Sequence, residues 1–416
     1  MATSPARRDA MRAYLILVMA FAAFAAATTT VEVNFANFLR ERFEIGEWYR
    51  GFLEFPRESQ GFAMVFYVVL LGTLTERRLF SLAAVVAAIG VAGLALLPAR
   101  ALADGIGGIG PGLPLILFLM CYSAGQHMGM LIERAIVVDH GDLASAGSRL
   151  GRIGFWKTLA GLAMAGIVWG LHAVTELDFG FYFAVAAGLF LASMALTRLA
   201  MRNQPEVRMR SRKLVLKRKF ARYYALCALF GVRKQVFITF AVWVLVVIYE
   251  QPVQTIAILW VATAATNLVA QPLIGRLIDR YGPRAVLSTD ALLLCGVCLM
   301  YGYGAQLFPP AIGLIVIGAT YVVDHVLFFV GAARAVYVGR LCADRDELST
   351  TLSMGVTVDH IFSMTVPLLG GIIWKASGYE VVFLLAGMIA VVTAITAFGI
   401  PRPTAPAPRP VAAATS

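Results

Sequence analysis

Apolar residues fill long, nearly uninterrupted runs along the chain, and short polar stretches separate these runs. A helix that crosses the hydrocarbon core of a bilayer needs roughly 20 mostly apolar residues, and about twelve runs reach that length. The pattern therefore predicts an all-α membrane protein that crosses the bilayer many times. The expected spans are 12–38, 48–74, 79–98, 113–139, 152–173, 179–200, 223–249, 252–277, 285–304, 310–338, 350–374 and 379–400.

Composition supports this pattern. The chain has 416 residues, of which 60% are hydrophobic and only 14% are charged, and its mean hydropathy is +0.78. A water-soluble domain of this size would need far more polar surface. The first run leads directly into further membrane sequence, so we interpret it as a retained helix rather than a cleaved signal peptide.

Positive charge predicts the orientation. The net charge is +11, and lysines and arginines gather in alternate loops, above all between the sixth and seventh runs. The positive-inside rule places that segment and both termini in the cytoplasm, as expected for a protein of the cytoplasmic (inner) membrane. A basic cluster can also bind nucleic acid, but this one joins two apolar runs, so we expect it to contact anionic lipid headgroups instead.

These boundaries divide the chain into two halves with polar ends. The Pro- and Ala-rich C-terminal tail lacks the apolar residues of a packed core and is expected to be disordered. The predicted parts are an N-terminal tail (1–11), a first helical half (12–200), a basic linker (201–222), a second half (223–400) and the C-terminal tail (401–416).

A short signature occurs twice, between the second and third runs and again between the eighth and ninth. In each copy a glycine and a leucine precede an acid beside an arginine, at the point where the chain leaves the membrane. Such a repeat indicates a duplicated membrane protein. Its defining residues are Gly72, Glu76 and Arg77 in the first copy and Gly275, Asp279, Arg280, Gly282 and Arg284 in the second.

The chain resembles the major facilitator superfamily over nearly its whole length. The resemblance rests on the helix count, the basic central loop and the motif G-x-L-x-D-R-x-G-x-R, which the second copy matches fully and the first only in part. It implies two pseudo-symmetric bundles of six helices each. It also implies that the motif acid binds the N-terminus of a neighbouring helix. Asp279 would then contact the fifth helix near 150–154, and Glu76 the eleventh near 349–351.

Ionisable residues inside a membrane span are costly and are therefore candidates for function. Glu54, Arg57 and Glu58 share one face of the second helix, with Glu58 roughly 24 Å from its cytoplasmic end. An intrahelical salt bridge near the outer surface is the alternative interpretation for these residues. Two acid–histidine pairs, suited to proton exchange, lie on the tenth and eleventh helices, where hydrogen bonds to a neighbouring helix are the alternative. The proton or coupling candidates are Glu58, Asp324, His325, Asp359 and His360.

Cations within the predicted spans allow two interpretations. They could bind an anionic substrate, or they could neutralise the buried acids across the bundle. The substrate or counter-ion candidates are Arg57, Arg134, Arg233, Lys234 and Arg334.

We therefore hypothesise a monomeric secondary transporter of a small organic, preferably anionic, solute, driven by the proton gradient. No enzyme, nucleotide, cofactor or metal-ligand motif is present. Two alternatives stay open: proton-driven efflux of amphipathic compounds, and a non-transporting receptor or assembly subunit that docks through the basic linker. A membrane enzyme acting on lipid has no supporting motif.

Overall fold

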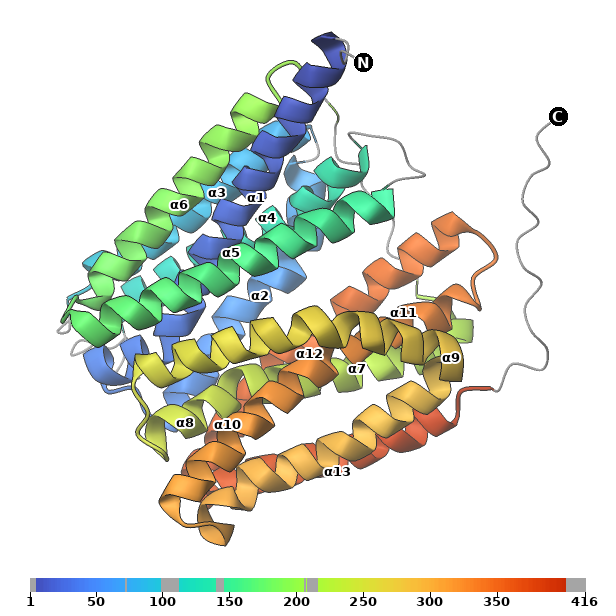
Figure 1. The fold of residues 1–416 in the computed structure, drawn as a ribbon. Helices are drawn as coiled ribbons and strands as arrows, with labels where there is room; N and C mark the ends of the chain where they lie inside the picture. Colours follow the sequence, from blue (N-terminus) through green and yellow to red (C-terminus); the bar gives the residue numbers. More distant parts are fainter. Residues whose placement is uncertain are drawn as a thin grey trace.

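The computed structural model describes residues 5–71, 73–98, 112–139, 146–205, 207 and 216–401 (Figure 1). Helices account for nearly all of these residues, and the described ranges contain no β-strand. The predicted all-α fold is confirmed.

The first half is a bundle in which α1 packs against α5 and α6, while α3 packs against α4 and α6. Phe24 of α1 links three of these helices, because its ring contacts Phe80 of α3 and Phe190 of α6. Close packing of α3 on α4 depends on Gly125, since a side chain there would collide with the backbone at Ala87. The helices are α1 (Pro5–Asn37), α2 (Glu47–Leu71), α3 (Glu76–Leu96), α4 (Leu113–Asp139), α5 (Ala146–Val174) and α6 (Phe179–Ala200).

The second half contains one long helical element that reverses direction. Within α9, Gly282 has φ +79°, a value that glycine adopts without strain, and Pro283 follows it. The chain turns back at this point (Figure 1), so α9 contains both the eighth and the ninth predicted spans. The helices are α7 (Ala221–Val236), α8 (Val242–Val247), α9 (Val253–Leu307), α10 (Pro310–Leu327), α11 (Ala332–Gly339), α12 (Arg345–Ser377) and α13 (Tyr379–Phe398).

In each half, the first long helix contains a π-helical segment toward its C-terminal end. The segment η1 (Phe38–Arg42) follows α1, and η6 (Phe237–Ala241) joins α7 to α8. Likewise, the 3₁₀ segment η7 (Phe328–Gly331) joins α10 to α11. Such irregular turns inside long helices often occur near functional sites, and the predicted spans 223–249 and 310–338 are each interrupted by one.

The helices suit a bilayer. Among the described residues, ten helices are long and apolar enough to cross a membrane. The helix α2 is not one of them, because it contains several charges, whereas α9 has 55 residues and at 1.5 Å per residue spans roughly 80 Å, enough for two crossings. Large apolar side chains cover the outside, for example Leu96 and Ile315, which are 83% and 73% exposed. The chain is an integral membrane protein.

The two halves meet at one end and diverge toward the other (Figure 1). We call the end where α1 begins and α13 finishes the terminal face, and the opposite end the far face. Near the far face α2 packs along α12 and α5 along α9. There Asn37 donates a hydrogen bond to the Gln251 carbonyl at 3.0 Å, and Gln254 donates to the His172 carbonyl at 2.9 Å. The structure is therefore closed at the far face.

Candidate functional site

Charged side chains form a ladder along one face of α2. Glu54 is fully buried and binds two cations of its own helix, Arg50 one turn before it and Arg57 one turn after it. The Arg57 Nε lies 2.7 Å from Glu54 Oε2, and Arg57 Nη1 lies 3.2 Å from Glu32 of α1. Residues three and four apart share a helix face, which is why these side chains meet. The ladder is thus balanced within the first half.

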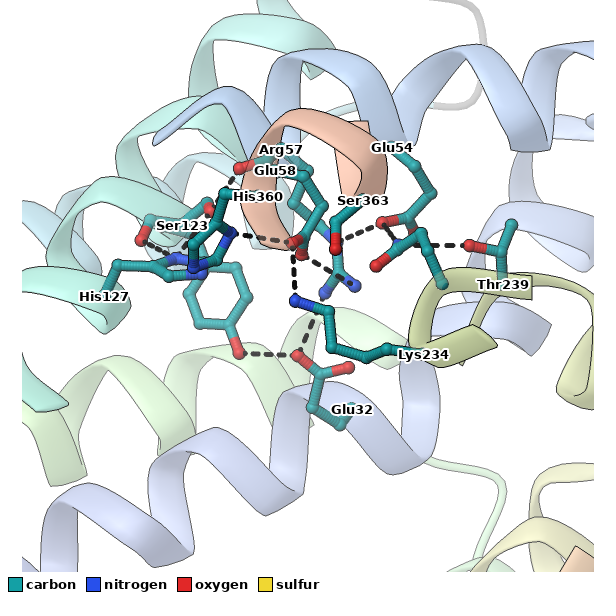
Figure 2. Close-up of polar contacts among 12 residues, drawn as sticks. Glu32, Glu54, Arg57, Glu58, Ser123, His127, Lys234, Thr239, His360 and Ser363 are labelled. Carbon is teal, nitrogen blue, oxygen red and sulfur yellow. Dashed lines mark hydrogen bonds and ion pairs between the residues drawn. The ribbon is translucent and has the colours of Figure 1, made fainter. Parts of the chain in front are cut away.

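The same ladder reaches across to the second half (Figure 2). Gln235 of α7 donates to Glu54 Oε2 at 2.8 Å. One turn further along α2, Glu58 Oε2 lies 3.6 Å from the Lys234 Nζ of α7 and 3.5 Å from the His360 Nδ1 of α12. The intrahelical salt bridge considered for Glu54 is present, but both acids also contact the opposite half. We call this group the central cluster, made of Glu32, Arg50, Glu54, Arg57, Glu58, Ser123, His127, Lys234, Gln235, Thr239, Asp359, His360 and Ser363.

Lys234 joins two acids from different halves. Its Nζ lies 3.4 Å from Asp359 Oδ1 of α12, in addition to its contact with Glu58. Asp359 Oδ1 also accepts a hydrogen bond from Ser363 at 3.0 Å. The helix α12 therefore directs both Asp359 and His360 toward the contact between the halves.

A second charged group lies inside the second half. Arg233 of α7 donates to both oxygens of Asp290 at 3.0 and 2.8 Å, and its Nη2 lies 3.4 Å from Asp324 Oδ1 of α10. All three side chains are buried. Among the described residues, Asp324 Oδ2 has no hydrogen-bond partner. We call these three residues the Arg233 triad. Lys234 and Arg233, adjacent on α7, thus bind acids in different groups.

The remaining predicted residues lie outside both groups. His325 packs its ring against Tyr321 and hydrogen-bonds the carbonyl of that residue through Nδ1 at 2.9 Å. Arg334 lies over the ring of Phe230, with its guanidinium carbon 3.6 Å from the ring centroid. Arg134 is exposed on α4. In this conformation the counter-ion interpretation applies to Arg57, Arg233 and Lys234.

Several residues of the two groups were not predicted. Glu32, His127 and Asp290 are ionisable residues within long apolar runs, and their depth in the membrane was the signal that could have identified them. Gln235 is uncharged, so no electrostatic argument singled it out. His127 of α4 lies beside His360, with ring centroids 5.4 Å apart.

Comparisons with known proteins agree with this architecture. The sequence model of the Major Facilitator Superfamily matches residues 226–416. The structure of the nucleoside transporter NupG has a TM-score of 0.73 at 13% identity, covering 93% of this chain and 98% of that chain. The second half of the chain thus matches the superfamily in sequence, and the chain as a whole shares the fold of the NupG transporter.

Two other transporter structures share this fold. The D-xylose-proton symporter has a TM-score of 0.69 at 12% identity, covering 93% of this chain and 97% of that chain. A bacterial homologue of the human lysosomal transporter Spinster, in an inward-facing and occupied conformation, has a TM-score of 0.67 at 14% identity, covering 95% and 97%. A search of curated proteins found no match.

The superfamily loop motif is exposed in its second copy. Asp279 is exposed at the terminal face, and among the described residues its carboxylate has no hydrogen bond or ion pair. The nearby Gly275 and, on α5, Gly151 and Gly154 have open space where a side chain would extend. The expected contact of Asp279 with the fifth helix is not made in this conformation, since the halves diverge at that face. Arg280 lies on the ring of its neighbour Tyr281.

The first copy of the motif is packed within its own half. Glu76 is fully buried in the first turn of α3, and its backbone N–H donates to the Val207 carbonyl of the linker at 2.9 Å. Arg77 donates to the Met201 carbonyl at 3.4 Å. Gly72, the first residue of this copy, lies outside the described residues.

A cationic pocket lies apart from the central cluster. It has a volume of about 300 Å³ and is lined by Arg77, Arg78, Ser81 and Arg198 at the terminal face. All four residues come from α3 and α6 of the first half, so rearrangement of the two halves would not open or close it directly. The central cluster, in contrast, joins the two halves.

Proposed function

We propose that this chain is a secondary transporter that moves a small organic solute across the cytoplasmic membrane by alternating access, driven by protons. The observation that carries the proposal is the central cluster, where α2 of one half meets α7 and α12 of the other through Glu54–Gln235, Glu58–Lys234 and Glu58–His360. Alternating access requires the halves to separate and rejoin around such a region. Polar contacts of moderate length can break and re-form at modest cost.

The predicted orientation assigns a direction to this conformation. If both termini are cytoplasmic, the terminal face is the inner face, and the protein is inward-facing with its outer side closed. The exposed Asp279 fits this assignment, because its contact with α5 would form when the inner side closes.

The Arg233 triad is our candidate for proton coupling. One guanidinium lies between two buried carboxylates, so the triad carries an excess negative charge unless one carboxylate binds a proton, and uncompensated buried charge is costly. Arg334, a further cation that interacts with Asp290, donates to the backbone carbonyls of Leu226 and Gly331. The other ionisable neighbours of Asp324 are His325, Cys298 and the buried phenols of Tyr301 and Tyr321.

Lys234 is our candidate for substrate binding. Its ammonium lies 3.4 and 3.6 Å from its two carboxylates, whereas a tight charge-assisted hydrogen bond measures about 2.7–2.9 Å. A carboxylate or phosphate on the solute could therefore compete for it. This supports an anionic solute over a neutral one.

The decisive experiment is proton flux in reconstituted vesicles that enclose a pH-sensitive dye, with a panel of organic anions and neutral solutes. We expect at least one anion to cause a proton flux. Asp324→Asn and Asp290→Asn should abolish that flux while preserving exchange of labelled solute between the two sides, which requires no net proton movement. Asp178→Asn is the matched control, because Asp178 is a surface acid paired with Arg42 and should behave as wild type.

The outcomes separate the alternatives. Normal proton flux in both triad variants would contradict the coupling role of the triad. A flux of opposite sign would indicate efflux by antiport. Failure of every solute, together with binding of a soluble partner to residues 201–222, would favour the receptor alternative.

A further inference from the structure

We propose that Glu58, His127 and His360 form a binding site for a divalent transition-metal ion, which ties the two halves together in this conformation. No local sequence motif indicates such a site, since the residues come from three helices, α2, α4 and α12. This proposal concerns binding of a metal ion alone and stands whether or not the solute is an anion.

The three side chains already converge (Figure 2). Each offers one ligand atom, and these atoms all lie within 4.8 Å of one another. Glu58 Oε2 and His360 Nδ1 are 3.5 Å apart. Donors bound to one Zn²⁺ at about 2.1 Å in a tetrahedral arrangement lie roughly 3.4 Å apart. The Glu58–His360 pair meets this spacing, and the His127 ligand atom, which lies no more than 4.8 Å from the other two, would need to approach by at most about 1.4 Å.

The surroundings of His127 resemble those of a metal ligand. Its Nδ1 lies 2.9 Å from the Ser123 carbonyl, which can only accept a hydrogen bond, so Nδ1 carries the hydrogen and Nε2 keeps its lone pair. Histidines that bind metals commonly donate their other ring N–H to a carbonyl or carboxylate, which fixes the ring orientation. Ser123 is itself held, because its hydroxyl donates to the Arg57 carbonyl at 2.6 Å.

The other two ligand atoms are buried and available. Among the described residues, neither Glu58 Oε2 nor His360 Nδ1 has a hydrogen-bond partner, although both atoms are shielded from solvent. Space for the imidazole of His360 depends on Gly61, because a side chain at that position would collide with the ring. Buried polar atoms without partners are costly, and an ion between them would satisfy both.

The neighbouring cation does not prevent binding. Lys234 contacts Glu58 at 3.6 Å but lies closer to Asp359, at 3.4 Å. A small shift toward Asp359 would leave Glu58 to the metal. Two imidazoles and one carboxylate suit Zn²⁺, Co²⁺ or Ni²⁺, whereas Mg²⁺ and Ca²⁺ prefer sites made of oxygen ligands. A fourth position would be left for water.

Bound metal would affect the movement of the halves. Glu58 and His127 belong to the first half and His360 to the second, so the ion would bridge them. Opening the far face requires α2 and α12 to separate, which would break the site. We therefore expect metal to bind this conformation selectively and to slow alternation.

The test uses the full-length purified protein, freed of any affinity tag, with ZnCl₂ as the probe in isothermal titration calorimetry. We expect one Zn²⁺ per chain, and at least about tenfold weaker binding in Glu58→Gln, His127→Gln and His360→Gln. His172→Gln and His325→Gln serve as matched controls, because these half-buried histidines lie outside the site, and both should bind Zn²⁺ as wild type does.

A second measurement keeps the proposal testable if a ligand variant misfolds. Co²⁺ added to the wild-type protein should give the intense visible absorption of a four-coordinate site with nitrogen ligands. Three outcomes would each overturn the site. The first is a weak, six-coordinate Co²⁺ spectrum, and the second is no Zn²⁺ binding at about 100 μM, a dissociation constant that corresponds to a binding free energy near 5.5 kcal/mol. The third is equal Zn²⁺ affinity in the ligand and control variants.

Discussion

At the scale of single residues, Glu54 is the charge on which the central cluster depends. It is fully buried and accepts from Arg50, Arg57 and Gln235. Removing its charge would leave two buried guanidinium groups without their main partner. Loss of one member of a buried ion pair typically costs about 3–5 kcal/mol.

We therefore predict that Glu54→Gln lowers the free energy of unfolding by about 3–5 kcal/mol, measured by unfolding in mixed micelles. Glu176→Gln, at an exposed acid between α5 and α6, should change it by less than about 0.5 kcal/mol. Equal stability of the two variants would show that Arg50 and Arg57 find other partners.

Sequence reasoning located buried charges better than it located their partners. Arg233 stood out as a cation too deep to reach water, but Asp290 lies 57 residues further along the chain and nothing in the local pattern linked the two. Lys234 and Asp359 were likewise both expected, without a way to pair them. Pairing is decided by how helices rotate and cross, and the sequence of one helix does not specify that.

At the scale of elements, the contact between α2 and α12 closes the far face. Gly51 lies directly against the Pro367 carbonyl and the backbone of Gly371. A methyl group there would collide with backbone atoms that cannot move independently. Overpacking of this kind typically costs about 1–3 kcal/mol, and the cost would fall only on conformations in which these helices touch.

We predict that Gly51→Ala shifts the protein toward conformations that are open at the far face. Labelling of a cysteine introduced at Trp48 by a membrane-impermeant maleimide should become roughly 5- to 160-fold faster, corresponding to that energy range. Gly166→Ala on α5 is the matched control, since nothing lies near its position. Unchanged labelling in Gly51→Ala would mean that the helices adjust without opening.

The start of α12 is joined to the segment before α7 by Glu347. Its carboxylate accepts from Lys217 at 2.7 Å, from Lys219 at 2.6 Å and from the Ala343 N–H at 2.8 Å. These three donors, Lys217 first, lower the pKa of Glu347 from 4.5 to about 2. A carboxyl with a lowered pKa in the folded state stabilises the fold above its unfolded pKa, and the stabilisation is lost as pH falls.

We predict that Glu347→Gln melts at a lower temperature than wild type at pH 7. The difference should persist to about pH 5 and shrink progressively between about pH 4.5 and 2. Melting curves in detergent across this range test the prediction. A difference that grew on acidification would contradict the assigned sign.

Element boundaries followed largely from the apolar pattern. The fourth predicted span, 113–139, matches α4 (Leu113–Asp139). The pattern did not reveal η6 or η7, because a π or 3₁₀ turn changes hydrogen bonding without changing which residues are apolar. The break between the predicted spans 252–277 and 285–304 did locate the turn within α9, where Gly282 has positive φ.

At the scale of the whole molecule, the resemblance to the superfamily predicted two helical bundles but not which conformation they adopt. A transporter sequence must support at least two arrangements of the same halves, with only a few kcal/mol between them. Under the proposed function, Asp279 would serve a contact that is absent from this arrangement. Glu76, in contrast, is buried here, so the acids of the two motif copies lie in different environments.

Asp279 gives the sharpest whole-molecule prediction. Its carboxylate is exposed here and would bind the N-terminus of α5 when the terminal face closes, a contact between an acid and a helix terminus that contributes about 0.3–1 kcal/mol, and up to about 2 when partly buried. Asp279→Asn should therefore leave the melting temperature of this conformation unchanged. It should also lower the population closed at the terminal face by roughly 2- to 30-fold, the factor that corresponds to this energy range.

Spin labels on the ends of α5 and α9 at the terminal face would report that population as the fraction of short distances. Arg284→Gln is a suitable comparison, because it removes a motif charge without removing the acid. If Asp279→Asn left the distance distribution unchanged, the acid would serve only membrane topology, and closure of the terminal face would have to depend on other contacts. If it lowered the melting temperature instead, Asp279 would already be bound in this conformation.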